Sequence, residues 1–444
     1  MKVTRRFVCI ALTIAGLIGT VHQTAQAAQT ARLSDKDIVD AYHYFLGRLL
    51  VLRQEHLDLQ GTGRWNVVVH RDAGGVASAN PNLDVTYSEA WIAVDKDSCT
   101  IVELPVIRKR YYTVQVLNGW GETVANINER NFPQHPAGKF GLCLRGADVR
   151  LPEGTQRVDL PGKKSRVLMR IELGADPAEA VKLQSQVKLY PTGKPNVEPA
   201  VEIQIFENER LPRVEAFNRA EAILKSEPDI NPGMGPLPAK VRAVAKAAGD
   251  VEELKRIDEV IVKQAIPRLQ QAVARLGTTN NGWSRLATIG NYGPDYLTRT
   301  AVNLAGIWAN NNREVTYFNS HVDSKGERLN GSNVYTLTFP KAQRPESLAR
   351  YFWSVTALDS VKFQVIENPL KRYRLSSYSK VQPNKDGSLT IWFADKQPEG
   401  VPQTNWNWLP TPAGQNYNLT FRFYGPGDRV VSGGYFPPPL IRKN

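Results

Sequence analysis

Two groups of aromatic, amide and charged residues are the candidates for binding or acid–base chemistry in this sequence. Amides and a carboxylate can fix a polar ligand while aromatic faces cover it. The N-terminal group has this composition and comprises Asn80, Asp84, Tyr87, Trp91, Tyr112, Asn118 and Trp120. The C-terminal group adds a guanidinium, which suits a two-pronged contact with a carboxylate, sulfate or phosphate. Its members are Trp353, Asp359, Arg372, Tyr373, Trp406 and Trp408.

Each group also has a purely structural interpretation. Asn80 and Asp84 fit an Asx-type turn, the aromatic residues fit a sandwich core, and Arg372 fits an ion pair with an aspartate. If both groups face one cleft, the aspartates are candidate general bases and Tyr87 or Tyr373 a candidate acid. No spacing in the sequence decides between these interpretations.

The histidines form no recognisable metal or catalytic pattern. Only His321 and Asp323 have ligand-like spacing, because side chains at i and i+2 share one face of a strand, and this segment also fits an ordinary turn. The sequence contains no His-Glu-x-x-His, phosphate-binding loop, dinucleotide fingerprint or Gly-x-Ser-x-Gly elbow. We therefore predict neither a metal nor a cofactor, and the sequence leaves open whether the protein is an enzyme.

The first 27 residues are typical of a secretory signal peptide. A positive start is followed by an apolar stretch over residues 7–21 and by a small-x-small cleavage site that ends at Ala27. The apolar stretch is shorter than the roughly 20 residues that span a bilayer, although an uncleaved anchor is the alternative. We predict cleavage after Ala27 and a periplasmic or secreted protein without a transmembrane segment.

Export also bears on the cysteines. Cys9 leaves with the signal, so the mature chain keeps Cys99 and Cys143, both in strand-like sequence. In an oxidising compartment these residues form either one disulfide or two buried free thiols. The sequence alone leaves both states open.

Length, composition and charge indicate a globular protein of two or three domains. The chain has 444 residues, 42% of them hydrophobic and 22% charged, and a formal net charge of +13. The signal holds three basic residues, which leaves 53 basic against 43 acidic residues, or +10, in the mature chain. This dispersed excess favours anionic partners, whereas the lack of a long basic block argues against nucleic acid. The oligomeric state stays open, a homo-oligomer included.

The order of helical and strand patterns predicts an α+β multidomain fold. Ser34 and Asp37 form a capping-box pattern before a helix that ends near Gly61. Alternation with a period of two then indicates strands, a helical stretch follows, and strands return towards the C-terminus. We expect two β-sandwich-like domains, a helical middle region and an N-terminal helix. The expected segments are a signal peptide at 1–27, a helix plus β domain at 28–175, a helical region at 176–312 and a β domain at 313–444.

A short internal echo links the two β regions. Residues 112–118 and 353–359 share an aromatic residue, a valine, a leucine and a terminal Asn or Asp at matching positions. Strand alternation alone often produces such matches, but the echo also fits a duplicated β domain.

Ordered motifs in both β regions point to a known family. The N-terminal motifs are Asn80-Pro81-Asn82-Leu83-Asp84, Thr86-Tyr87-Ser88, Trp91 and the run from Arg110 to Trp120. The C-terminal motifs are Phe352-Trp353-Ser354, Asn368-Pro369, Arg372-Tyr373, and the runs 384–391, 407–414 and 434–439. Together they resemble a bacterial family of paired domains of unknown function, number 1254 followed by number 1214. The resemblance implies two β-sandwich-like domains with helical segments and little about activity.

We predict from these observations an exported protein that binds a small polar or anionic ligand in a cleft between its β domains. One alternative is a metal-independent hydrolase or lyase that uses aspartate and tyrosine groups. Another is a structural or envelope-interaction protein without a ligand site. A cleft lined by Tyr87, Trp91, Arg372 and Tyr373 would favour binding or catalysis, whereas burial of all four without a cavity would favour a scaffold.

Overall fold

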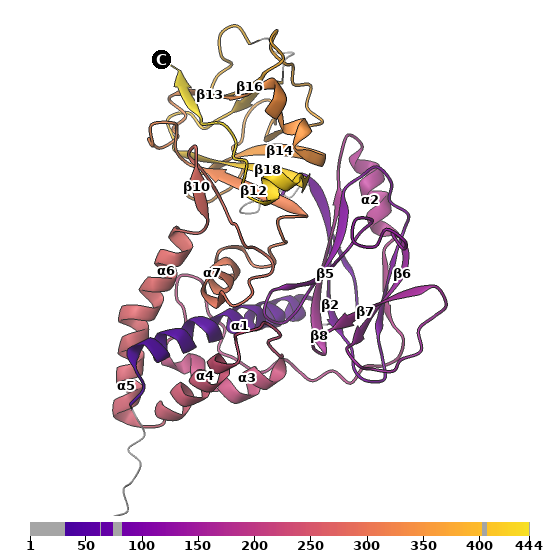
Figure 1. Ribbon diagram of the computed structural model, residues 1–444, viewed down its shortest axis with the longest axis vertical. Helices are drawn as coiled ribbons and strands as arrows, with labels where there is room; N and C mark the ends of the chain where they lie inside the picture. Colours follow the sequence, from indigo (N-terminus) through magenta and orange to yellow (C-terminus); the bar gives the residue numbers. More distant parts are fainter. Residues whose placement is uncertain (1–31, 63, 74–81, 402–405, 444) are drawn as a thin grey trace, which may run out of the picture.

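The structure is a computed structural model that describes residues 32–62, 64–73, 82–401 and 406–443. The predicted signal peptide and Asn80 lie outside these residues. Figure 1 shows three parts: helices at the lower left, an N-terminal β part at the right and a C-terminal β part at the top. The predicted α+β fold, with an N-terminal helix and two β-rich parts, is confirmed.

The helical part is built around α1 (Asp35–Thr62). The Ser34 hydroxyl accepts a hydrogen bond from the backbone N–H of Asp37 at 3.1 Å, as the capping-box pattern predicts. The apolar face of α1 packs on α4 (Pro236–Ala247), α5 (Val251–Val260) and α7 (Tyr296–Gly306) and forms one core with them. The other helices are α2 (Pro177–Ser185), α3 (Ala220–Ser226), α6 (Ile266–Ala274) and α8 (Asp428–Val431). Within the described part of the chain, every helix is too short or too polar to cross a bilayer.

Short helical turns connect some of these helices and strands. A π-helical turn, Ile261–Ala265, joins α5 to α6, where Pro267 at the start of α6 lacks the N–H of a continuous helix. Three 3-10 turns lie at Val214–Phe217, Lys341–Gln343 and Pro345–Ser347.

The N-terminal β part is a sandwich of two sheets. One sheet has the order β1-β2-β8-β4-β5, with β1 (Val69–Arg71), β2 (Val85–Ala93), β8 (Lys164–Glu172), β4 (Tyr112–Leu117) and β5 (Thr123–Ile127). The other has the order β7-β6-β3-β9, with β7 (Thr155–Leu160), β6 (Gly138–Leu144), β3 (Thr100–Leu104) and β9 (Lys188–Pro191). Inward side chains of both sheets form one apolar core.

The C-terminal β part is a second sandwich. Its first sheet has the order β10-β11-β12-β18-β14-β15, with β10 (Thr278–Asn280), β11 (Trp283–Arg285), β12 (Val315–Ser320), β18 (Tyr417–Pro426), β14 (Ala349–Asp359) and β15 (Arg374–Ser376). Its second sheet has the order β17-β16-β13-β19, with β17 (Trp408–Pro410), β16 (Leu389–Ala394), β13 (Val334–Phe339) and β19 (Ile441–Lys443). Aromatic residues dominate the core between these sheets.

The two sandwiches correspond strand by strand. The order β2-β8-β4-β5 matches β12-β18-β14-β15, and β7-β6-β3-β9 matches β17-β16-β13-β19. In each second sheet the first two strands in this order, β7 with β6 and β17 with β16, are parallel. The sequence echo falls in the same register, because Thr113 pairs with Arg170 and Ser354 with Arg422. This correspondence supports a duplicated β domain.

The two sandwiches contact each other through a mixed apolar and polar interface. Val85, Tyr111, Val315, Phe352 and Tyr424 form a shared core cluster. Beside it, Arg130 of the N-terminal part forms an ion pair with the buried carboxylate of Glu314 at 2.5 Å. These contacts hold the β2/β8 and β12/β18 sheets beside one another.

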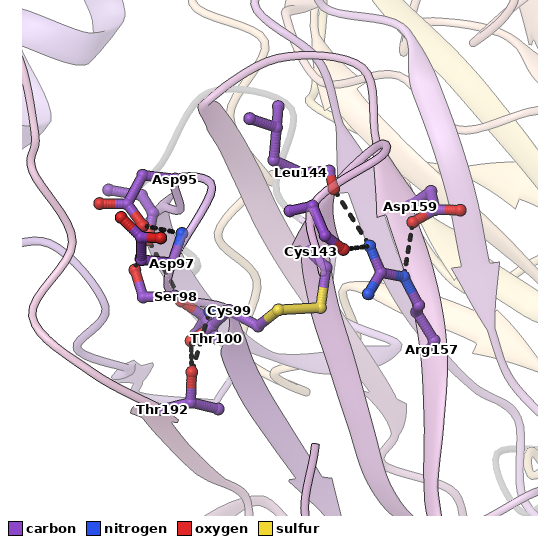
Figure 2. The surroundings of a disulfide bond; sticks show 12 residues. Asp95, Asp97, Ser98, Cys99, Thr100, Cys143, Leu144, Arg157, Asp159 and Thr192 are labelled. Carbon is purple, nitrogen blue, oxygen red and sulfur yellow. Dashed lines mark hydrogen bonds and ion pairs between the residues drawn. A yellow bond between two sulfur atoms is a disulfide. The ribbon is translucent and has the colours of Figure 1, made fainter. Parts of the chain in front are cut away.

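A disulfide closes the second sheet of the N-terminal sandwich (Figure 2). It joins Cys99 to Cys143, one position beyond the Thr100–Leu142 pair of β3 and β6. On one side the Cys99 backbone N–H donates to the Thr192 hydroxyl at 3.0 Å, and on the other Arg157 donates to the Leu144 carbonyl at 3.1 Å. The bridge thus joins the ends of the neighbouring strands β3 and β6, away from the chamber described below.

Candidate functional site

A cavity of about 620 Å³ lies where the two sandwiches meet the end of α7. We call it the chamber. Its polar wall comes from both first sheets, and its apolar wall from the end of α6, the segment after β11 and α7. The described lining residues are Asn82, Tyr87, Arg170, Leu276, Leu286, Ile289, Val302, Ala305, Gly306, Ile307, Trp308, Ala309, Asn310, Asn312, Tyr317, Asn319, Thr420 and Arg422.

Each sandwich contributes one tyrosine–arginine pair to the chamber. Tyr87 on β2 lies directly across from Arg170 on β8, and Tyr317 on β12 lies across from Arg422 on β18. In both pairs the guanidinium carbon lies 5.5 Å from the centre of the tyrosine ring. The pairs occupy equivalent strands of the two sandwiches, so the chamber is built from two matching halves.

The two guanidiniums are buried cations. Arg170 is 6% exposed and Arg422 3% exposed. Each interacts electrostatically with both tyrosines, so the four side chains form a single cluster. Among the described residues that line the chamber none is acidic. The buried Asp84 carboxylate, which is not part of this lining, acts electrostatically on Arg422. Guanidiniums bind carboxylate and phosphate oxygens well, so a wall with two of them is suited to an anion.

Neighbouring groups hold both arginines in place. Arg170 donates to the Gln115 side chain at 2.7 Å and to the Trp308 carbonyl at 3.4 Å, and its buried Nε has no hydrogen-bond partner in the described structure. Arg422 donates to the Thr356 hydroxyl at 3.0 Å. Because both cations are fixed by strand pairing and by these bonds, little side-chain ordering is needed when an anion binds.

The tyrosines add hydrogen-bond donors. Burial raises the pKa of Tyr317, so its phenol stays protonated at neutral pH. A protonated phenol can donate to a carboxylate or phosphate oxygen. Two guanidiniums and two phenols are thus available to one anionic group.

The opposite wall is apolar. It includes Leu286, Ile289, Val302 and Ile307. Next to it Trp308 adopts a left-handed backbone conformation, with φ of 69°, which non-glycine residues rarely adopt. This turn directs the Trp308 carbonyl to Arg170, while its ring packs edge-on against Trp91 at 5.7 Å. The end of α7 thus joins the apolar wall to the polar one.

A second, open hollow of about 410 Å³ lies beside β15, and we call it the basic hollow. Arg372 and Tyr373 line it together with Lys371, Arg374, Lys380 and Trp406, and with Leu83, Ser376, Tyr378 and Ser379. The Arg372 guanidinium lies 4.3 Å from the Trp406 ring centre and donates to the Trp408 carbonyl at 2.9 Å. Three of the C-terminal candidates, Arg372, Tyr373 and Trp406, therefore lie in a different hollow from Tyr87.

Asp84 lies between the two hollows. Its side chain is fully buried and forms an ion pair with Arg374 of the basic hollow. Its other oxygen accepts a hydrogen bond from Ser354 at 2.5 Å and one from Tyr424 at 3.3 Å. Asp84 also acts electrostatically on Arg422 of the chamber. The carboxylate thus holds the two sandwiches together.

The remaining predicted site residues lie in cores or turns. Tyr112 and Trp353 are in the two sandwich cores, and Trp120 is in the helical core. The Asn118 side chain accepts from the backbone of Trp120 and Glu122 and so closes a turn. The Trp91 indole donates a hydrogen bond to Asp58, and the Trp408 indole donates to the Ala394 carbonyl. The Asp359 carboxylate accepts hydrogen bonds from the backbone of Val361 and Lys362.

Sequence reasoning missed Arg170, Tyr317 and Arg422. Arg170 and Arg422 each lie between apolar or aromatic neighbours in a strand, and a single cation in such a run resembles an outward, solvated position. Tyr317 follows the polar Thr316 in an alternating strand and stands out even less. The signal that could have identified the two arginines is burial on both faces of β8 and β18. A charge in a strand without a solvated face needs a partner or a ligand. In the described part of the chain no group of three or more His, Cys, Asp or Glu residues is arranged to hold a metal ion.

Two segments of the chain match known protein families. Residues 65–191 match the family described as "Protein of unknown function (DUF1254)", and residues 314–428 match "Protein of unknown function (DUF1214)". The chain therefore belongs to the family that pairs these two domains, in the N- to C-terminal order that its motifs predict. Comparison with curated proteins finds no match.

Comparison with solved structures gives one similarity of fold. The crystal structure of the VPA0106 protein from Vibrio parahaemolyticus is similar with a TM-score of 0.66 and 20% sequence identity, over 92% of this chain and 100% of that one. A putative uncharacterized protein from Burkholderia cenocepacia aligns with a TM-score of 0.44 and 11% identity, over 92% and 95% of the chains. The first similarity is one of fold.

Proposed function

We propose that this protein binds a small anionic molecule in the chamber between its two sandwiches. The observation that carries the proposal is the convergence of Arg170 and Arg422, both more than nine-tenths buried, on a cavity whose described lining has no acidic residue. A bound anion would accept hydrogen bonds from these guanidiniums, among them the Nε of Arg170, for which the described residues offer no partner, and the two phenols would add further donors.

The size of the chamber fits a small molecule rather than a polymer. Its volume of about 620 Å³ falls within the usual range of small-molecule pockets, roughly 300–1,000 Å³. It is therefore a better candidate than the smaller and more open basic hollow, where Arg372 is already stacked on a tryptophan.

Thermal unfolding with acetate in place of chloride, at constant ionic strength, tests anion binding. Acetate should raise the Tm of the wild-type protein, because a ligand that binds only the folded state stabilises it. Arg422→Gln, which keeps a polar group near Thr356, should lose this increase. Arg285→Gln is the matched control, since Arg285 is equally buried but bonds to the Val431 carbonyl outside the chamber lining. Loss of the increase in Arg372→Gln instead would move the site to the basic hollow.

We also propose that the protein is exported and that its signal peptide is cleaved after Ala27. The Cys99–Cys143 disulfide supports this, because such bridges persist in oxidising compartments. Mass spectrometry of the protein from its own host should find a chain that begins at Ala28. A chain that retains the first 27 residues would contradict the proposal.

A further inference from the structure

We infer that the connection between β14 and β15 docks on an anionic lipid bilayer. This inference goes beyond the proposed ligand binding and does not depend on it. It follows from exposed apolar and basic side chains beside β15, the edge strand of its sheet. These side chains belong to residues 361–363, 370–371, 378 and 380, and we call them the docking face.

The docking face exposes several large apolar side chains. They are Val361, Phe363, Leu370 and Tyr378. Val361 is 82% exposed, more than any other large apolar side chain in the described part of the chain, and Leu370 is 53% exposed. Single exposed apolar residues are normal on a protein surface, whereas a group of them marks an interaction site.

Two ordered turns carry these side chains. The Asp359 carboxylate accepts hydrogen bonds from three backbone N–H groups of the turn at 361–364. The Asn368 side chain accepts one from the backbone beyond the second turn, at 3.1 Å. Phe363 and Lys371 have left-handed backbone conformations, with φ of 55° and 49°. Because both turns are held in this way, little conformational freedom is lost when they dock.

The two turns leave the C-terminal sandwich from the same place. Val365 and Tyr373 pack together in one small apolar cluster. Phe363 lies two residues before Val365, and Lys371 lies two residues before Tyr373. Lys371 also lines the basic hollow, together with Tyr378. The apolar turns and the basic hollow therefore adjoin one another.

The charge of this segment is positive. Residues 359–380 contain five basic and two acidic side chains, and both acidic groups accept hydrogen bonds within the segment. Arg374 is paired with the buried Asp84, whereas Lys362, Lys371 and Lys380 are exposed. Each exposed lysine near an anionic bilayer surface strengthens binding by roughly fivefold.

The mixture of apolar side chains and lysines favours a bilayer over a protein partner. Apolar tips can enter the boundary between headgroups and acyl chains while the ammonium groups stay at the phosphates. Protein–protein interfaces, in contrast, are depleted in lysine. Val251 and Leu254 of α5 are also exposed, but residues 250–263 hold five acidic and three basic side chains. An anionic bilayer would repel that surface, so the docking face is the better candidate.

Sedimentation with lipid vesicles tests this inference. The chain that begins at Ala28 holds every described residue and lacks the apolar stretch at 7–21, which could bind vesicles by itself. Vesicles with equal parts of phosphatidylglycerol and phosphatidylcholine should bind it at least about tenfold more tightly than phosphatidylcholine alone. Added salt should weaken this binding, because it screens exposed charges.

Two double variants separate the contributions of charge and apolar area. Lys362→Gln with Lys371→Asn should weaken binding to the anionic vesicles by at least about tenfold. Phe363→Asn with Leu370→Gln should weaken it to a similar extent, because less apolar area leaves water. Asparagine tolerates the left-handed conformation at positions 363 and 371, so the turns should persist.

Matched controls lie in the helical part, far from β14 (Figure 1). Lys225→Gln with Lys246→Gln removes the same net charge from exposed positions on α3 and α4. Leu254→Gln with Val262→Gln removes two exposed apolar side chains from α5 and the turn after it. Both controls should bind vesicles as the wild type does. Circular dichroism melting shows whether each variant is folded.

Several results would overturn the inference. These are equal binding to both kinds of vesicle, no binding by folded protein, and an equal loss in the control variants. Sedimentation velocity without vesicles adds another: a dimer that Phe363→Asn with Leu370→Gln dissociates would make the face an interface between copies of this chain. Arg422→Gln should bind vesicles normally, so failure of the proposed ligand binding is seen separately.

Discussion

Asp84 joins the two sandwiches in the region between the two hollows. Its buried carboxylate contacts Arg374 and Ser354 of the C-terminal sandwich, although Asp84 itself precedes β2 of the N-terminal one. The Asx-type turn predicted at Asn80 lies outside the described residues, but the backbone N–H of Asp84 donates to the Asn82 side chain at 3.0 Å. A carboxylate so engaged is better placed to join two sheets than to remove a proton from a ligand.

Replacing Asp84 distinguishes its contribution to stability from its effect on ligand binding. Asp84→Asn should destabilise the protein by about 3 kcal/mol, because a buried ion pair loses one partner. It should also tighten acetate binding a few-fold, since a negative charge near Arg422 is removed. Chemical unfolding and calorimetry measure the two effects. Asp97→Asn, at an exposed surface position, is the control, and weaker binding in Asp84→Asn would contradict the electrostatic argument.

Glu227 is a buried carboxyl outside the chamber. It lies at the end of α3 against the backbone of Gly119 and Gly162, and among the described residues its carboxyl accepts a hydrogen bond from the Gly119 N–H alone, at 3.3 Å. Burial raises its pKa to about 7, against the attraction of Arg48. Glu55 and Lys164 are the other charged groups that act on it. The protonated form is therefore favoured in the folded state.

The raised pKa of Glu227 makes stability depend on pH. Below about pH 4.5 the carboxyl is protonated in both states, and its contribution is fully present. As pH rises from 4.5 to 7 the unfolded chain ionises first, so about 3 kcal/mol of stability is lost. Glu227→Gln should remove this loss and exceed the wild type in stability at pH 8. Urea unfolding across this pH range measures it. Glu153→Gln, at an exposed site, should retain the wild-type profile, and an unchanged profile in Glu227→Gln would refute the assignment.

Strand pairing explains which parts of the site could be read from the sequence. Alternation and turn residues located the strands, and the echo between residues 112–118 and 353–359 matched the true register opposite Arg170 and Arg422. Tyr87 was identified because it belongs to a dense polar–aromatic motif. The arginines were missed because their role depends on pairing with distant strands. Arg170 lies 83 residues after its partner Tyr87 on β2, and Arg422 lies 105 residues after its partner Tyr317 on β12.

The disulfide acts at the level of a single sheet. Closing the loop between Cys99 and Cys143, 44 residues apart, stabilises the folded state by roughly 4 kcal/mol in the chain-entropy account. The double variant Cys99→Ser and Cys143→Ser should therefore lower the free energy of unfolding by about this amount. Acetate binding should persist, because the bridge lies in the sheet that does not line the chamber. Loss of binding in folded double variant would contradict this separation.

At the scale of the whole molecule, the order of helix, β, helical and β regions was predictable from local patterns. The site was not, because it forms only where three parts of the chain meet. Its polar wall comes from the two family-matched segments, whereas Leu276 to Asn312 of the wall lie between them. Local patterns report secondary structure, but they do not report which surfaces of different sandwiches face one another.

A ligand shared by the two sandwiches should protect both at once. Hydrogen exchange with acetate present should slow in β8 and β18 together, because each strand supplies one guanidinium. Arg422→Gln should abolish the protection in both strands. Protection confined to one strand in the wild type would show that the anion does not bridge the sandwiches.

The matching halves of the chamber have a consequence for assembly. A chain with one such sandwich alone would offer a lone guanidinium on an open wall, and only a twin copy facing it would restore the enclosure. In a single polypeptide the two copies are covalently linked, so the pocket forms without association of two chains and does not depend on protein concentration. The segment that joins the two copies also supplies α7, which lines the remaining side.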